Sequence, residues 1–192
     1  MFTQIGQVLV DATFGFFVFL LLARFHFQWL RVPFRNQVGA FMIAATNWIV
    51  MPARKLIPAL AGLDLASLIA AWLLQGAALY LTLALIGREP ASVEAFGSLA
   101  CVAVVDLLRY SLYILMFALV VQAVLSWVNP YSPVGPLFDA LTRPFLRPLR
   151  RIVPPLANVD LTPLVLIILV QILLIPVAYL RALVAGIRVI GA

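Results

Sequence analysis

Two sets of polar residues recur in this chain in the same order and at the same spacing. Each set holds an arginine, a proline, an aspartate and a glutamine. The first copy is Arg54, Pro58, Asp64 and Gln75, and the second is Arg150, Pro154, Asp160 and Gln171. Arginine and aspartate can form an ion pair, glutamine is a neutral donor and acceptor, and proline bends the backbone. These residues can therefore form ion pairs and hydrogen bonds with polar partners.

Each aspartate directly precedes an apolar run and would occupy the first turn of a helix. A carboxylate is stabilised there because the helix N-terminus carries partial positive charge. The arginine ten residues earlier can turn back across the proline bend and pair with the carboxylate. Two roles are open for this pair: a clamp that holds the preceding segment to the helix, or a site for a phospholipid headgroup or a partner protein.

Each glutamine follows its aspartate by eleven residues, which on a helix is about three turns with about 20° of rotation left over, so the two residues share one face. Gln75 and Gln171 then fall inside apolar runs, where a polar side chain is costly unless it finds a partner. They could bond to each other or to Gln122 as contacts between helices, or they could line a polar pathway for an ion or a small solute.

The sequence holds no residue set typical of a catalytic or metal site. Cys101 is the only cysteine and His26 the only histidine, which excludes an internal disulfide and the usual structural zinc set. The chain also lacks a glycine-rich phosphate loop and a nucleophile beside a base. Asp106 and Arg109, three residues apart, are expected to neutralise each other at the outer surface. We expect no enzymatic activity and no cofactor.

The elements that position these residues must lie in a membrane. Of 192 residues, 65% are hydrophobic and 10% are charged, and the mean hydropathy is +1.13. Soluble proteins are about half apolar and about a quarter charged, and a soluble fold of this length could not bury so much apolar surface. The 13 Lys and Arg against 7 Asp and Glu give a net charge of +6. In so apolar a chain this surplus indicates anionic lipid as the partner, rather than nucleic acid.

Four stretches are long and apolar enough to cross a bilayer, which takes about 20 helical residues. They are residues 5–30, 65–86, 99–128 and 161–180. No basic residue precedes the first stretch and no small-residue cleavage pattern follows it, so we expect a retained helix rather than a cleaved signal. The sequence therefore predicts an all-α membrane protein with four transmembrane helices.

The two halves of the chain are copies of each other. Residues 38–75 align without a gap to residues 134–171, and 14 of these 38 pairs are identical, whereas composition alone would give roughly a tenth. Each unit, 1–96 and 97–192, comprises a spanning helix, a long connection and a second spanning helix. The units therefore enter the membrane in the same direction, and we expect a parallel repeat about an axis along the membrane normal.

Each long connection is expected to be an amphipathic segment in the headgroup plane. Between residues 134 and 152, apolar side chains recur at three- and four-residue spacing, which is typical of an amphipathic helix. The arginines of this segment are Arg143, Arg147, Arg150 and Arg151, and each contributes about 1 kcal/mol of binding near an anionic surface. Pro144 and Pro148 are expected to prevent a single continuous helix.

The distribution of basic residues predicts the orientation. Nine of the 13 lie at the end of the first spanning helix or in the two connections, and four lie elsewhere. Because basic residues collect on the cytoplasmic side, we expect both connections in the cytoplasm and both termini outside. Arg181 and Arg188 oppose this orientation.

The run Arg150-Arg151-Ile152-Val153-Pro154, followed by Asp160-Leu161-Thr162-Pro163 and Gln171, resembles the YggT family of small bacterial membrane proteins with plastid relatives. The first-unit copies extend the resemblance over nearly the whole chain, although Ala66-Ser67 replaces the Thr-Pro pair there. The resemblance implies a multi-pass protein of the bacterial cytoplasmic membrane. It also implies roles in osmotic-stress tolerance and potassium uptake, in envelope or division processes, and, for plastid relatives, in haem attachment to cytochrome b6.

Two functions follow as hypotheses. The first is a non-enzymatic scaffold or assembly factor whose partners are anionic lipids and a membrane protein or a second copy, without nucleic acid contact. The second is a component of ion or small-osmolyte transport, with Asp64 and Asp160 at the mouths and the glutamines at the midplane. A water-accessible cavity that joins the glutamines to an aspartate favours transport, and a dry interface between them favours the scaffold.

Overall fold

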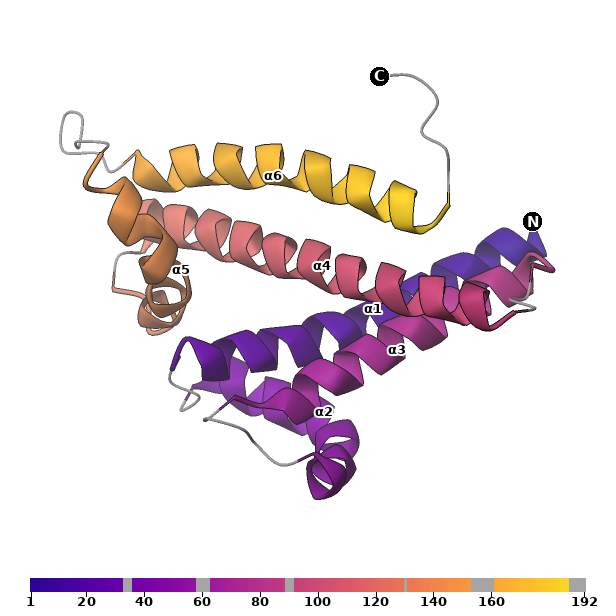
Figure 1. Ribbon diagram of the computed structural model, residues 1–192. Helices are drawn as coiled ribbons and strands as arrows, with labels where there is room; N and C mark the ends of the chain where they lie inside the picture. The colour runs from indigo at the N-terminus through magenta and orange to yellow at the C-terminus, as the bar shows by residue number, and fades with distance from the viewer. Residues whose placement is uncertain (33–35, 58–62, 89–91, 130, 153–160, 187–192) are drawn as a thin grey trace.

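The computed structural model describes residues 1–32, 36–57, 63–88, 92–129, 131–152 and 161–186 (Figure 1). The described residues form six helices. They are α1 (Phe2–Trp29), α2 (Gln37–Leu56), α3 (Leu65–Leu85), α4 (Val93–Val128), α5 (Gly135–Leu149) and α6 (Thr162–Val184).

Four of these helices, α1, α3, α4 and α6, are long and apolar enough to span a membrane. They cover the four predicted stretches, so the predicted fold class is confirmed. Helix α4 begins earlier than its apolar run, at Val93, because the Ser92 side chain accepts a hydrogen bond from the backbone N–H of Ala95 and caps the first turn.

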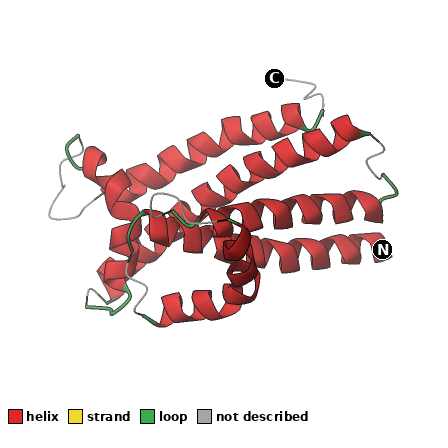
Figure 2. Ribbon diagram, turned by 60° about the horizontal axis from the view of Figure 1, so that its bottom comes forward, coloured by secondary structure: helices red, strands yellow, loops and turns green. Residues whose placement is uncertain are grey.

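The two units are parallel, as predicted. Helices α1 and α4 run in one direction and α3 and α6 in the other, while the connecting helices α2 and α5 lie at the same end of the bundle (Figure 1). The turned view shows the long helices running side by side (Figure 2). The chain therefore repeats one helical hairpin with its intervening helix in the same sense.

Helix α4 carries the interface between the units. Within each unit the two spanning helices pack on each other, α1 on α3 and α4 on α6, and α4 also packs against α3 and α1. Small buried side chains of α3, namely Ala66, Ala70 and Ala71, allow close approach of its neighbours. Helix α6 lies on the far side of α4 and leaves most of its apolar side chains exposed, as a lipid-facing helix does.

Helix α5 contradicts the expectation that its prolines break it. Pro144 and Pro148 both lie inside one continuous helix. They are four residues apart, so they share a face, and both are exposed. The backbone carbonyls that lose their helical partners therefore face outward, where water or headgroups can satisfy them. The opposite face buries Leu137 and Leu141 against the bundle.

Candidate functional site

Asp64 lies at the start of α3 and is almost completely buried. Its Oδ2 lies 2.8 Å from a terminal nitrogen of Arg54 in α2, so the ion pair expected from the sequence is present. The Ser67 hydroxyl donates to the same oxygen at 2.7 Å. The carboxylate accepts no backbone N–H of its own helix. Side chains, rather than the helix N-terminus, are therefore its hydrogen-bond partners.

Arg24 of α1 is a third partner of Asp64, and the sequence analysis did not identify it. Its Nε lies 3.5 Å from the Asp64 carboxylate. One terminal nitrogen donates to Thr46 at 2.8 Å and to Asn47 at 3.0 Å, both on α2. Arg24 has no charged counterpart in the second unit, where Val120 occupies the equivalent position. A charge within an apolar span needs a partner, and this rule could have identified it.

These contacts define a clamp, formed by Arg24, Thr46, Arg54, Asp64 and Ser67, that joins the three helices of the first unit. Burial acts to raise the pKa of the Asp64 carboxyl. The hydrogen bonds from Arg54 and Ser67, with the positive charges of Arg54 and Arg24, outweigh burial and hold this pKa below its usual value. The carboxylate is therefore ionised in the folded protein at neutral pH.

In the second unit, a hydrogen bond between two neutral side chains holds the connecting helix. Thr142, the copy of Thr46, is fully buried, and its hydroxyl donates to Gln122 of α4. Pro58, Pro154 and Asp160 lie outside the described residues. The Thr46 and Thr142 contacts show that each connecting helix is held to the first spanning helix of its own unit by a buried threonine.

The two repeated glutamines have different surroundings. Gln75 is buried in α3, and its Nε2 donates to Oδ2 of Asp106 in α4 at 2.9 Å. Gln171 is exposed on α6, and Gln122 is bonded to Thr142. The expectation that the glutamines bond to each other or to Gln122 is therefore wrong. The reason is the packing order, because α4 separates α3 from α6.

Asp106 pairs with Arg181 of α6 and not with Arg109. The Nε of Arg181 donates to one carboxylate oxygen, and its NH2 group lies 3.4 Å from the other. Asp106 is buried inside the bundle. Arg109 instead donates from Nε to the Tyr113 hydroxyl at 2.9 Å, and its guanidinium carbon lies 5.4 Å from the centre of the Tyr113 ring. Asp106 bonds to side chains of α3 and α6, whereas Arg109, three residues on, bonds within α4.

These residues line a polar cavity of about 350 Å³. Its polar side chains come from all four spanning helices and are Asp11, Gln75, Thr82, Asp106, Arg109, Tyr110, Tyr113 and Arg181. Both acidic and both basic groups lie within helices that are otherwise apolar, which is typical of a functional site in a membrane protein. Among the described residues, no three His, Cys, Asp or Glu side chains lie together as a metal site requires.

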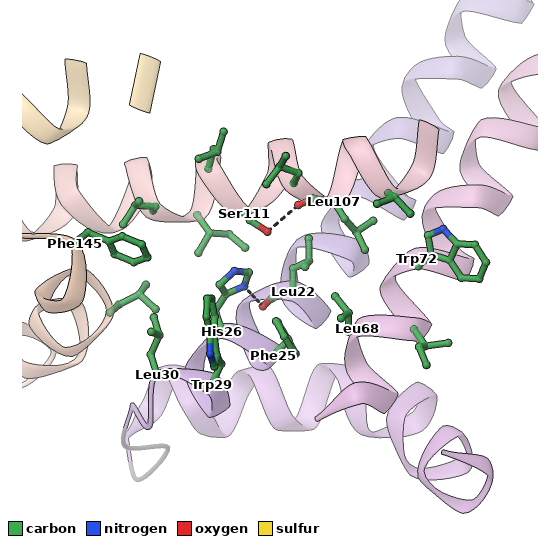
Figure 3. Close-up of a pocket in the computed structure, with 17 residues that line it drawn as sticks. Leu22, Phe25, His26, Trp29, Leu30, Leu68, Trp72, Leu107, Ser111 and Phe145 are labelled. Carbon is green, nitrogen blue, oxygen red and sulfur yellow. Dashed lines mark hydrogen bonds between the residues drawn. The ribbon is translucent and has the colours of Figure 1, made fainter. Parts of the chain in front are cut away.

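A second, apolar cleft of about 540 Å³ lies between the two units. Residues of α1, α3 and α4 line it, and Leu141 and Phe145 of α5 contribute to its wall (Figure 3). His26 donates from Nδ1 to the Leu22 carbonyl at 2.7 Å, and Ser111 donates to the Leu107 carbonyl at 2.8 Å (Figure 3). Because these polar groups are bonded to their own helices, the cleft offers an apolar surface suited to a hydrocarbon chain.

The arginines of the second connection lie on the outside of the molecule. Arg143, Arg147, Arg150 and Arg151 are exposed in and after α5. Arg143 pairs with Asp139, four residues earlier on the same helix. Helix α5 therefore has an apolar side packed on the bundle and a basic side turned away from it.

Comparison with known proteins places the chain among bacterial membrane proteins. The family model described as CCB3/YggT matches residues 3–85 and 101–181, one segment in each unit. An uncharacterized protein of Pseudomonas aeruginosa is 32% identical over 151 residues, covering 77% of this chain and 75% of the relative. The uncharacterized protein YggT of Escherichia coli K12 is 29% identical over 172 residues, covering 88% of this chain and 87% of the relative. No solved structure matches significantly. With both of its units matched, the chain belongs to the CCB3/YggT family.

Proposed function

We propose that this protein is a non-enzymatic scaffold or assembly factor of the bacterial cytoplasmic membrane that holds an anionic phospholipid. The observation that carries the proposal is the double role of α5. Leu141 and Phe145 form part of the wall of the apolar cleft, while Arg143 and Arg147 of the same helix are exposed. In this proposal α2 and α5 lie at the cytoplasmic surface, where anionic headgroups are found.

A phospholipid fits this arrangement in both of its parts. An acyl chain in the cleft would replace contacts with bulk lipid by contacts with apolar side chains, so van der Waals packing would hold it there. The headgroup would then lie at the level of α5. The long arginine side chains can reach it, and arginine binds phosphate oxygens in a bidentate manner.

The test uses the full-length protein in nanodiscs of phosphatidylcholine with a minor fraction of phosphatidylglycerol. We expect the wild-type protein to retain phosphatidylglycerol selectively in native mass spectrometry. Changing Arg143, Arg147, Arg150 and Arg151 together to Gln should lower that selectivity by at least about tenfold, because each arginine contributes about 1 kcal/mol. The control is Arg88→Gln, which removes an exposed charge at the opposite end of the bundle. Unchanged selectivity in the fourfold variant would overturn the proposal.

The polar cavity favours a second candidate, a component of ion or small-solute transport. Gln75 and the carboxylates of Asp11 and Asp106 line this one space. A cavity that joins a glutamine to an aspartate is the feature that favours transport. Gln171 and Asp64 are not among the residues that line the cavity. The cavity therefore contains only one of the two repeated glutamines, and its aspartates differ from those expected at the mouths. Potassium flux into proteoliposomes tests this candidate, and flux that is equal in wild type and Asp106→Asn would exclude the cavity as its path.

A further inference from the structure

We propose that the polar cavity binds a zwitterion, a small molecule or lipid headgroup that carries an ammonium and an anionic oxygen group. The carboxylate of Asp11 would bind the ammonium, and the guanidinium of Arg109 would bind the anionic group. The inference deepens the transport candidate, since a transported solute must first bind. A binding site can also exist without transport.

One of the two opposite charge pairs that line the cavity is already satisfied. Arg181 donates to both oxygens of Asp106, and Gln75 donates to Oδ2. Asp106 is also buried. This group is therefore a neutral, hydrogen-bonded wall of the cavity and offers little charge to a ligand.

The other two charges are not paired. Within the described part of the chain, Asp11 makes no ion pair and no hydrogen bond, although it lines the cavity from α1. Arg109 donates one hydrogen bond, from Nε to the Tyr113 hydroxyl, and its guanidinium lies over the Tyr113 ring. Its terminal nitrogens have no acceptor among the described residues. Asp11 is exposed and Arg109 is half-buried. Charges within spanning helices are costly without partners, so one ligand that pairs with both would stabilise them.

The charge balance of the cavity selects the chemical class of the ligand. Asp11 and Asp106 balance Arg109 and Arg181, so the site as a whole is neutral. A simple cation or anion would satisfy one free group and leave the other uncompensated. A zwitterion satisfies both and adds no net charge to a site inside the membrane.

The space is sufficient for a small ligand. About 350 Å³ far exceeds the volume of one water molecule, about 30 Å³. Gly15 of α1 also lines this space, and a Cβ atom there would lie 3.5 Å from the Tyr110 hydroxyl. A larger side chain at this position would extend into the cavity, so Gly15 keeps this side open.

The experiment measures binding of glycine to the full-length protein in maltoside micelles by isothermal titration calorimetry. Acetate and methylamine are the matched half-ligands, since each carries one of the two charges of glycine. We expect both half-ligands to bind the wild-type protein at least about tenfold more weakly than glycine does. Asp11→Asn and Arg109→Gln should each lower the affinity for glycine by a similar factor. Glu94→Gln, outside the cavity at the start of α4, is the control and should leave binding unchanged.

A second arm distinguishes a free solute from a lipid headgroup. The protein in nanodiscs that contain phosphatidylethanolamine is compared with Asp11→Asn and Arg109→Gln by native mass spectrometry. Glycine binding that the variants lose identifies a solute site, and lipid retention that they lose identifies a headgroup site. Either result supports the proposal.

Two outcomes would overturn the zwitterion site. One is that neither glycine nor phosphatidylethanolamine binds the wild-type protein, and the other is that both variants bind as the wild type does. Because Asp11 makes no hydrogen bond and no ion pair among the described residues, Asp11→Asn should keep the wild-type melting temperature, which separates loss of binding from loss of folding. Glycine binding without any glycine flux would overturn the transport candidate and leave the binding site intact.

Discussion

Gln75 in the first unit donates a hydrogen bond of 2.9 Å to Asp106 in the second. Asp106 is at the same time the ion-pair partner of Arg181, so three spanning helices meet at one carboxylate. Neither charge is part of the repeat, since Val10 and Leu85 occupy the equivalent positions of the first unit. The duplicated hairpin has therefore become asymmetric where its two copies meet.

The first prediction concerns the two repeated glutamines. Gln75→Leu should lower the free energy of unfolding by about 1 to 2 kcal/mol, because it removes a hydrogen bond to a buried carboxylate. Gln171→Leu should leave stability unchanged or raise it, because that side chain is exposed on the apolar surface of α6. Denaturation in mixed micelles of increasing dodecyl sulfate content measures both. Equal effects of the two substitutions would contradict the different surroundings of these residues.

The second prediction compares two arginines as partners of Asp106. Arg181→Leu should destabilise the protein by about 3 kcal/mol, because it leaves a buried carboxylate without its ion pair. Arg109→Leu should cost less than about 1 kcal/mol, since it removes a contact with a partly exposed tyrosine. Thermal unfolding of the two variants in the same detergent provides the comparison. A larger loss for Arg109→Leu would restore the pairing that sequence spacing predicts.

The sequence was sufficient for the features that depend on local pattern. Length and hydropathy located the four spanning helices, and the alignment of residues 38–75 with 134–171 predicted their parallel repeat. The Arg54–Asp64 pair was also predictable, because the two residues flank one bend and are close in the chain. These features follow from local patterns or from the comparison of the two copies, so no knowledge of helix packing was needed.

The partner of Asp106 was not predictable in the same way. Arg109 is three residues away in the chain, and Arg181 is 75 residues away. Only the packing of α6 on α4 brings Arg181 to the carboxylate. The charge of Arg181 inside a strongly apolar helix was a usable signal, since such a residue needs a partner.

The prolines of α5 show a similar limit. The sequence predicts that Pro144 and Pro148 break the helix, because each removes a backbone donor and crowds the preceding turn. Their four-residue spacing puts both on one face, and the structure leaves that face exposed. Exposure depends on where α5 packs, and the sequence alone does not determine it.

The third prediction is a pH dependence that originates at Asp64. Its pKa is held below the ordinary value of 3.8, so its contribution to stability is present above that value and is lost as the pH falls through the lower pKa of the folded state. As the pH falls below about 4, the wild-type protein should therefore lose more stability than Asp64→Asn does. Melting temperatures of both proteins across this range measure the difference, and parallel curves would show that the carboxylate is not stabilised by the clamp.

The last prediction uses Thr46 and Thr142, which are equivalent in the repeat and both fully buried. Thr46 accepts a hydrogen bond from the buried guanidinium of Arg24, whereas Thr142 donates to the neutral side chain of Gln122. A hydrogen bond to a charged group contributes about 1.5 to 3 kcal/mol and a neutral one about 1 kcal/mol. Thr46→Val should therefore be more destabilising than Thr142→Val by about 1 kcal/mol. The changes in burial and volume are the same at both sites, so unfolding titrations isolate the charge, and equal losses would mean that Arg24 is held without Thr46.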